Sequence, residues 1–198
     1  MNKAAIREFV RAKRPELDAR LASRDSRKIQ DRVFDLQEVQ AARLVALYMA
    51  VQGEVQTDRL ARRCRERGIA LCVPALRREA GAYGLARWDE RTRLAKGLGG
   101  IPEPAAPDWV ALDDVDAVVV PGLAFDADGG RLGHGRGHYD RLLSGMRGPA
   151  TRIGVCFEWQ VVDRVPMDEN DVRMDRVVTE KRMMTATAGS RCEEVTTR

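Results

Sequence analysis

Apolar and polar positions alternate with a helical period in the N-terminal part of the chain. Over residues 2–22 apolar side chains recur near helical spacing, which predicts an amphipathic helix that Pro15 must kink or split. Residues 23–39 show a similar period, and Ser26 is placed to cap this second helix. We therefore expect two helices before the first strand.

Short apolar runs follow, and such runs are typical of parallel strands that are buried on both faces. The first covers residues 43–51 and the second residues 69–73, where Pro74 ends it. Between them Thr57 is placed to cap a helix and Gly68 to close it. The order strand, helix, strand predicts a parallel crossover unit, and ligands of such sheets bind at the carboxyl ends of the strands.

The same alternation continues toward the C-terminus. Further strands are predicted at residues 83–88, 116–120, 152–157 and 176–179. Residues 96–107 are rich in Gly and Pro and are expected to form a loop within the domain. The pattern predicts one α/β domain over residues 1–182, and the polar residues 183–198 are expected to be a disordered tail.

Composition and charge narrow the classes of partner. The chain has 198 residues, 44% hydrophobic and 32% charged, which is ordinary for a globular domain. A net charge of +4 favours anionic ligands such as phosphates and polyglutamates. Aromatic residues make up only 5% and basic residues are interleaved with acidic ones, so nucleic acid is an unfavoured partner. No apolar run approaches the ~20 residues of a membrane-spanning helix, so no membrane partner is expected.

The cysteines and the N-terminus bear on the compartment. Cys64, Cys72, Cys156 and Cys192 are scattered, and no pair has the spacing of a zinc site. The N-terminal residues are polar and carry no secretory signal. We therefore expect reduced thiols in a cytoplasmic protein.

The most informative stretch is residues 121–141, which lies between a predicted strand and a helical pattern. Gly133, Gly135 and Gly137 alternate with larger residues, and glycine lets the backbone approach a ligand closely. Amides of a loop that leads into a helix bind anions, usually phosphate. The spacing matches neither the Walker pattern nor the dinucleotide fingerprint, so a mobile surface loop remains the alternative. Positive charge is added by Arg131, Arg136 and Arg141.

Asp140 places an acid in this basic setting. Because it would repel a bare phosphate, we expect a divalent cation between them, and Mg²⁺ binds one or two carboxylates together with phosphate oxygens. Asp175, at the start of the last predicted strand, has a modest claim to share that ion. His134 and His138 lie four residues apart, but nothing nearby completes a zinc site, so both are expected to line the loop.

Three further charged residues have two readings each. Lys3 and Arg7 lie on one face of the first helix, where they form either a solvated surface or a second pair of cations that contact phosphate. Glu54 follows the end of the first strand, where it is either an exposed charge or a ligand contact. The spacing alone leaves both alternatives open.

The 121–141 stretch as a whole reads PGLAFDADGGRLGHGRGHYDR, and it resembles the signature of the 5-formyltetrahydrofolate cyclo-ligase family. Weaker motifs of that family occur in this chain in the same order, namely Lys3 with Arg7, residues 53–57, Pro74, residues 100–104, Gln160 and residues 175–180. The resemblance therefore covers nearly all of residues 3–180.

The resemblance implies a single three-layer α/β domain whose mostly parallel central sheet is flanked by helices. It also implies an enzyme that uses ATP and Mg²⁺ to convert 5-formyltetrahydrofolate into 5,10-methenyltetrahydrofolate, with release of ADP and phosphate. The formyl oxygen would be phosphorylated first, and N10 of the folate would then close the ring. Little covalent chemistry is asked of the protein, which must position the reactants and cancel charge.

The resemblance also carries residue roles. Arg136 and Asp140 would be catalytic, Arg136 as a charge stabiliser, and Asp140 and Asp175 would hold Mg²⁺. ATP would contact Lys3, Ala4, Ala5, Ile6, Arg7, Arg131, Leu132, Gly133, His134, Gly135, Arg136, Gly137, His138 and Tyr139. The folate, in either its monoglutamate or its polyglutamate form, would contact Met49, Glu54, His134, Gly135, Arg136, Gly137 and His138.

The sequence departs from the family pattern at a few positions. His134, Arg136 and His138 stand where members often have an aromatic residue, Gly or Lys, and an aromatic residue, and Asn170 stands where His is frequent. The loop changes keep the glycines and the positive charge, so phosphate binding is expected to be kept, whereas the resemblance does not define how folate stacks on this loop. The alternatives are a non-catalytic relative that binds folate or nucleotide, and a basic RNA-associated protein. A monomer or weak dimer is expected.

Overall fold

The computed structural model describes residues 1–14, 18–51 and 53–186. Its α-helices are α1 (Lys3–Lys13), α2 (Ala19–Phe34), α3 (Gln37–Gln40), α4 (Asp58–Glu66) and α5 (His138–Ser144). Short 3₁₀ turns span Leu98–Gly100, Leu112–Asp114 and Glu158–Gln160. Among the described helices, none is long and apolar enough to cross a membrane.

An eight-stranded sheet forms the centre of the molecule, in the order β12-β11-β10-β7-β1-β2-β3-β6. The strands from β11 to β2 run parallel, and β3, β6 and β12 add antiparallel edges. The sheet strands are β1 (Leu44–Ala46), β2 (Ala70–Arg77), β3 (Ala82–Arg87), β6 (Trp109–Val110), β7 (Ala117–Pro121), β10 (Thr151–Val155), β11 (Arg176–Val178) and β12 (Met183–Thr185). Two small hairpins pair β4 (Leu94–Lys96) with β5 (Pro102–Pro104), and β8 (Ala124–Phe125) with β9 (Arg131–Leu132).

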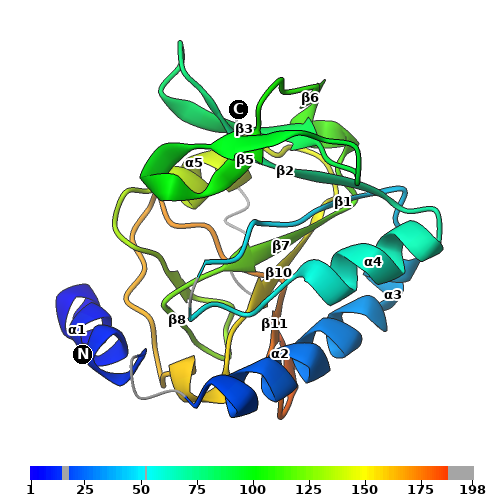
Figure 1. Cartoon of the computed structure of the whole chain (residues 1–198). Helices are drawn as coiled ribbons and strands as arrows, with labels where there is room; N and C mark the ends of the chain where they lie inside the picture. Colours follow the sequence, from blue (N-terminus) through cyan, green and yellow to red (C-terminus); the bar gives the residue numbers. More distant parts are fainter. Residues whose placement is uncertain (15–17, 52, 187–198) are drawn as a thin grey trace, which may run out of the picture.

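Helices cover both faces of this sheet, because alternate residues of each strand point to opposite sides. Val45 and Val119 belong to the core cluster that contains residues of α2, α3 and α4, and these helices lie together in Figure 1. Ala46 and Val118 belong to a second cluster, which contains Leu143 of α5. The predicted three-layer α/β architecture with a mostly parallel sheet is confirmed.

The N-terminal helix packs outside these two clusters. Ile6 and Val10 are fully buried against Leu123, Leu132 and Val165, so α1 lies beside β8 (Figure 1). The hydrophobic stripe predicted for this helix therefore faces the 121–141 stretch. As a result, the two stretches expected to carry phosphate-binding cations are held together by their own core.

The helix boundaries differ from the prediction around the second helix. The first helix ends at Lys13, as the split at Pro15 required, although residues 15–17 lie outside the described part. α2 begins at Ala19, and the Asp18 carboxylate accepts hydrogen bonds from the backbone N–H groups of residues 20 and 21. The prediction of Ser26 as its N-cap is wrong, because Ser26 is buried within α2 and its hydroxyl accepts a bond from the Gln56 N–H at 2.7 Å.

The strand boundaries also need correction. β1 is much shorter than residues 43–51, whereas β2 continues through Pro74, which was expected to end it. Cys72 O accepts a bond from Leu47 N–H, and Leu76 N–H donates on the same edge to Glu103. Because β1 has already ended beside Pro74, the missing N–H of this proline breaks no bond within the sheet.

Two loop predictions and one capping prediction change as well. Residues 96–107 contain β5 and part of the β4–β5 hairpin rather than a plain loop. The predicted tail begins too early, since Met183–Thr185 forms β12 and pairs with β11; residues 187–198 lie outside the described part. Thr57 precedes α4 as expected, but its hydroxyl donates to Tyr48 O at 2.8 Å instead of capping the helix.

Candidate functional site

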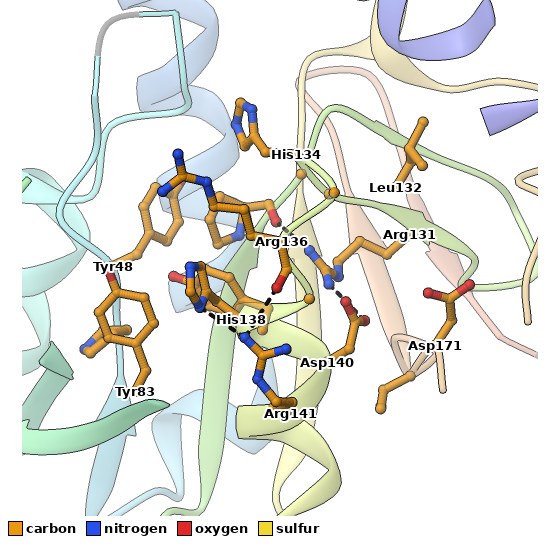
Figure 2. A pocket seen from close by; sticks show the side chains of 18 of the residues that line it. Tyr48, Tyr83, Arg131, Leu132, His134, Arg136, His138, Asp140, Arg141 and Asp171 are labelled. Carbon is orange, nitrogen blue, oxygen red and sulfur yellow. Dashed lines mark hydrogen bonds and ion pairs between the residues drawn. The ribbon is translucent and has the colours of Figure 1, made fainter. Parts of the chain in front are cut away.

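A cavity of about 1200 Å³ opens at the carboxyl ends of β1 and β7, where the crossover pattern predicted a ligand site. It is bordered by α1, the loop after β1, the β4–β5 hairpin, the start of α5 and residues 168–172. Figure 2 shows the side chains that converge on it. The predicted site residues that line it are Lys3, Arg7, Met49, Glu54, Arg131, Leu132, Gly133, His134, Gly135, Arg136, Gly137, His138, Tyr139 and Asp140.

The glycine loop (residues 133–137) forms one wall of the cavity. Gly135 and Gly137 have φ angles of +99° and +64°, which side chains rarely tolerate, and Gly137 directly precedes α5. A β-carbon on Gly135 would lie 3.5 Å from the Arg7 guanidinium carbon. Arg7 also donates from Nε to Gly133 O at 3.1 Å. The loop and α1 are therefore joined by a direct bond at the site.

Asp140 is paired with a buried arginine. Arg131 donates from Nη2 to Asp140 Oδ1 at 2.8 Å, and its side chain is only 3% exposed, whereas that of Asp140 is 17% exposed. Figure 2 shows this pair just below the glycine loop. The carboxylate is thus held in a fixed place at the edge of the cavity.

Arg141 holds the glycine loop and His138 in place. Its Nη2 donates to Arg136 O at 3.0 Å and contacts His138 Nδ1 at 3.2 Å (Figure 2). Burial lowers the pKa of His138, and the cations of Arg141 and Arg136 lower it further. The imidazole is therefore neutral near pH 7 and accepts at Nδ1. Its ring meets that of Tyr83 edge to face, with centroids 5.1 Å apart.

His134 also stays neutral, because partial burial and nearby arginines such as Arg14 and Arg11 lower its pKa. Within the described ranges, no group of three His, Cys, Asp or Glu side chains is placed to hold a metal ion. Both histidines border the cavity, as expected for residues that line the loop.

Glu54 borders the cavity from the loop after β1. Its Oε2 accepts a bond from Val51 N–H at 3.1 Å. Burial raises the pKa of Glu54, while the Val51 amide and the charge of Arg14 act in the opposite direction. Arg14 lies against Gly53, where a β-carbon would come within 2.7 Å of its side chain. A carboxyl group with a raised pKa in a cavity is typical of a functional site.

Sequence reasoning missed an acidic segment on the opposite side of the cavity. Asp168 and Asp171 both accept bonds from Lys3 Nζ, at 2.6 and 2.5 Å. Burial would lower the pKa of Lys3, but the hydrogen bonds and charges of the two aspartates raise it overall. Asn170 and Glu169 line the same side. The only feature that the sequence analysis noted in this segment is Asn170, which stands where the family often has His, and it does not indicate the contact with Lys3.

Four predicted site residues do not line the cavity. Ala4 is exposed, Ala5 N–H donates to Asn2 at the start of α1, and Ile6 is buried in the core. Asp175 lies at the start of β11, and its Oδ2 accepts a bond from Arg152 N–H at 2.8 Å. Because β11 runs parallel to β7, Asp175 lies at the amino ends of the strands, whereas the cavity lies at their carboxyl ends. The predicted pairing of Asp140 and Asp175 around one ion is therefore corrected.

Comparison with known proteins identifies the family of the chain. The family model described as the 5-formyltetrahydrofolate cyclo-ligase family matches residues 1–180. The 5-formyltetrahydrofolate cyclo-ligase of Mycolicibacterium smegmatis is 32% identical over 152 residues, which cover 74% of this chain and 78% of the relative. That of Escherichia coli K12 is 29% identical over 178 residues, with 88% and 96% covered.

A solved structure gives the same result for the fold. The NMR structure of Aquifex aeolicus 5,10-methenyltetrahydrofolate synthetase has a TM-score of 0.83 and 34% sequence identity, and the match covers 99% of this chain and 98% of that one. The family model spans most of the chain, and relatives above 30% identity carry the same family name. The chain therefore belongs to the 5-formyltetrahydrofolate cyclo-ligase family, a family of ligases of folate metabolism.

Proposed function

We propose that the cavity catalyses the ATP- and Mg²⁺-dependent cyclisation of 5-formyltetrahydrofolate to 5,10-methenyltetrahydrofolate, with release of ADP and phosphate. The observation that carries this proposal is that one cavity joins a basic glycine loop and Asp140 to the half-buried carboxyl group of Glu54, whose pKa is raised. Its volume of about 1200 Å³ is larger than the ~300–1000 Å³ of common single-ligand pockets, which suits two reactants side by side.

The nucleotide is assigned to the side formed by α1 and the glycine loop. Lys3 and Arg7 project from α1, and Arg136 lies exposed on the loop, so positive charge surrounds the backbone amides. Clusters of this kind bind phosphate groups. When the nucleotide binds, Lys3 would exchange its contacts with Asp168 and Asp171 for phosphate oxygens.

The donor set near Asp140 fits a magnesium ion bound together with phosphates. Oδ1 of Asp140 is engaged by Arg131, while Oδ2 has no protein partner among the described residues. Mg²⁺ needs few protein carboxylates, because water and phosphate oxygens complete its shell. Asp140 would hold the ion, with Asp171 in the same cavity as a further oxygen donor, and the ion would neutralise charge on the phosphates.

The residues of this chain would then position and stabilise the reacting groups. The formyl oxygen is a poor leaving group, and phosphorylation makes it a good one. Attack of N10 on the formyl carbon then forms the new C–N bond, phosphate departs and N10 loses its proton. Arg136 would stabilise the charge on the transferred phosphoryl group, and Glu54 would hydrogen-bond the pterin ring and fix its position.

The direct test is an absorbance assay in the near ultraviolet, where the conjugated methenyl product absorbs. Purified protein is mixed with 5-formyltetrahydrofolate, ATP and Mg²⁺. We expect product formation that requires both ATP and the metal and that is lost in Asp140→Ala. If no product forms although calorimetry detects ATP binding, the proposal is wrong and the chain is a non-catalytic relative.

A further inference from the structure

Arg131 was expected to contact the nucleotide, but the structure places its side chain beneath the glycine loop. Only 3% of the side chain is exposed, although it borders the cavity. The guanidinium donates to Asp140 Oδ1 at 2.8 Å and to Pro121 O at 3.4 Å. Its carbon lies 5.5 Å from the centre of the Tyr139 ring. Arg131 thus contacts the end of β7 and the first turn of α5.

The glycines above Arg131 show how tightly it is enclosed. A β-carbon on Gly133 would lie 3.0 Å from Arg131 Nη1, and one on Gly122 would lie 3.3 Å from its Cγ. Both distances are shorter than ordinary van der Waals contact, so these two positions need small residues partly because of this side chain. By contrast, Arg136 and Arg141 are exposed on the same stretch.

We propose that Arg131 is a positioning residue that acts through Asp140, and that it is not a ligand of the nucleotide. By binding Oδ1 and the end of β7, it fixes the carboxylate and leaves Oδ2 available to a metal ion. A two-point contact of this kind needs the planar fork of arginine, which a lysine cannot reproduce. The inference rests on the proposed function in one respect, namely that Asp140 holds the metal.

The two roles predict different behaviour in Arg131→Lys. A lysine still binds phosphate as a point charge, so a direct contact to ATP would largely survive this change. A positioning role would not survive it, because one ammonium group cannot hold both Asp140 and Pro121 O. Because only the positioning role depends on the metal, ATP affinity must be measured both with Mg²⁺ and with a chelator.

The experiment is calorimetric titration of ATP into the wild-type protein, Arg131→Lys, Asp140→Asn and the double variant. With the chelator, we expect Arg131→Lys to bind ATP within about twofold of wild type, whereas with Mg²⁺ its affinity should fall about tenfold. In the Asp140→Asn background, Arg131→Lys should add no further loss, because residues that act through one another are not additive. Arg7→Gln is the matched control, and it should weaken ATP binding with and without the metal.

Two results would overturn the inference. The first is that Arg131→Lys, measured with the chelator, loses as much affinity for ATP as Arg7→Gln does. The second is that the double variant loses affinity by the product of the losses of Arg131→Lys and Asp140→Asn. If Arg131→Lys does not fold, as thermal melting would reveal, the neutral pair Arg131→Gln with Asp140→Asn removes the buried charges together. That pair should bind ATP as Asp140→Asn does, and weaker binding would again contradict the inference. If these tests contradict the role of Arg131 but the wild-type protein still turns over substrate, the proposed function stands. If the wild-type protein does not bind ATP, both the proposed function and the role of Arg131 are contradicted.

Discussion

The two ends of the sheet use aspartates in opposite ways. At the amino ends of the strands, Asp116 accepts bonds from the backbone N–H groups of Arg43 and Leu44, and Asp175 accepts one from Arg152. At the carboxyl ends, Asp140 pairs with the side chain of Arg131. The first group satisfies main-chain donors where strands begin, and the second leaves an oxygen beside a cavity. In this sheet, the two aspartates at the amino ends bind main-chain N–H groups, whereas Asp140 lies beside the cavity that we propose as the active site.

The sharpest test of this comparison is activity. Asp140→Asn should lower kcat/KM by about two to three orders of magnitude, because a charge that stabilises the phosphates would be lost. Asp175→Asn should remain within a few fold of wild type in the same absorbance assay, since it lies across the sheet from the cavity. Equal losses of kcat/KM in the two variants would contradict the proposed difference between the two ends of the sheet.

Arg136 tests the cavity end further. Arg136→Ala should lower turnover by about a hundredfold while changing ATP affinity much less, because the charge it faces develops mainly in the transition state. The measurement is kcat beside the dissociation constant of ATP. Equal effects on both would mean that Arg136 only binds the nucleotide.

For the free energy of unfolding, we expect the larger effect at the amino ends of the strands, where Asp175 lies. Asp175→Ala leaves the N–H of Arg152 without its partner, so we expect it to cost about 1–3 kcal/mol in the free energy of unfolding. Urea denaturation of this variant and of Asp140→Asn gives the comparison. A loss below 0.5 kcal/mol, roughly that of an ordinary surface change, would contradict the structural role.

The smallest expected effect is a pH dependence from Glu54. Burial raises the pKa of its carboxyl group above the unfolded value, so the folded protein binds more protons between those two pKa values. Stability should therefore fall as the pH rises through that window, by at most about 1.4 kcal/mol per pH unit. Glu54→Gln should flatten this part of the urea-midpoint profile, and an unchanged slope would mean that Glu54 does not titrate there.

The sequence predicts the cavity end well because its signals are local. The order of strand, glycine loop and helix around residues 121–141 needs no knowledge of distant contacts. The role of Asp168 and Asp171 does, because their partner Lys3 lies 165 and 168 residues away. Ser26 failed as a cap for the same reason, since its hydroxyl bonds with Gln56, a residue in the loop that leads into α4. Asp175 was misplaced because a carboxylate at the start of a strand also satisfies a backbone N–H.

The contact between Lys3 and Asp171 has a consequence for synthesis on the ribosome. Lys3 is made well before its partners, because its ion pairs and the packing of α1 need residues that appear more than 100 positions later in the chain. The sheet strands from β1 to β7 can pair earlier, but the cation-bearing helix must wait for the 168–171 segment. During translation, the apolar side chains of α1 therefore stay without their packing partners until those residues have been made, and in that interval chaperones can bind them.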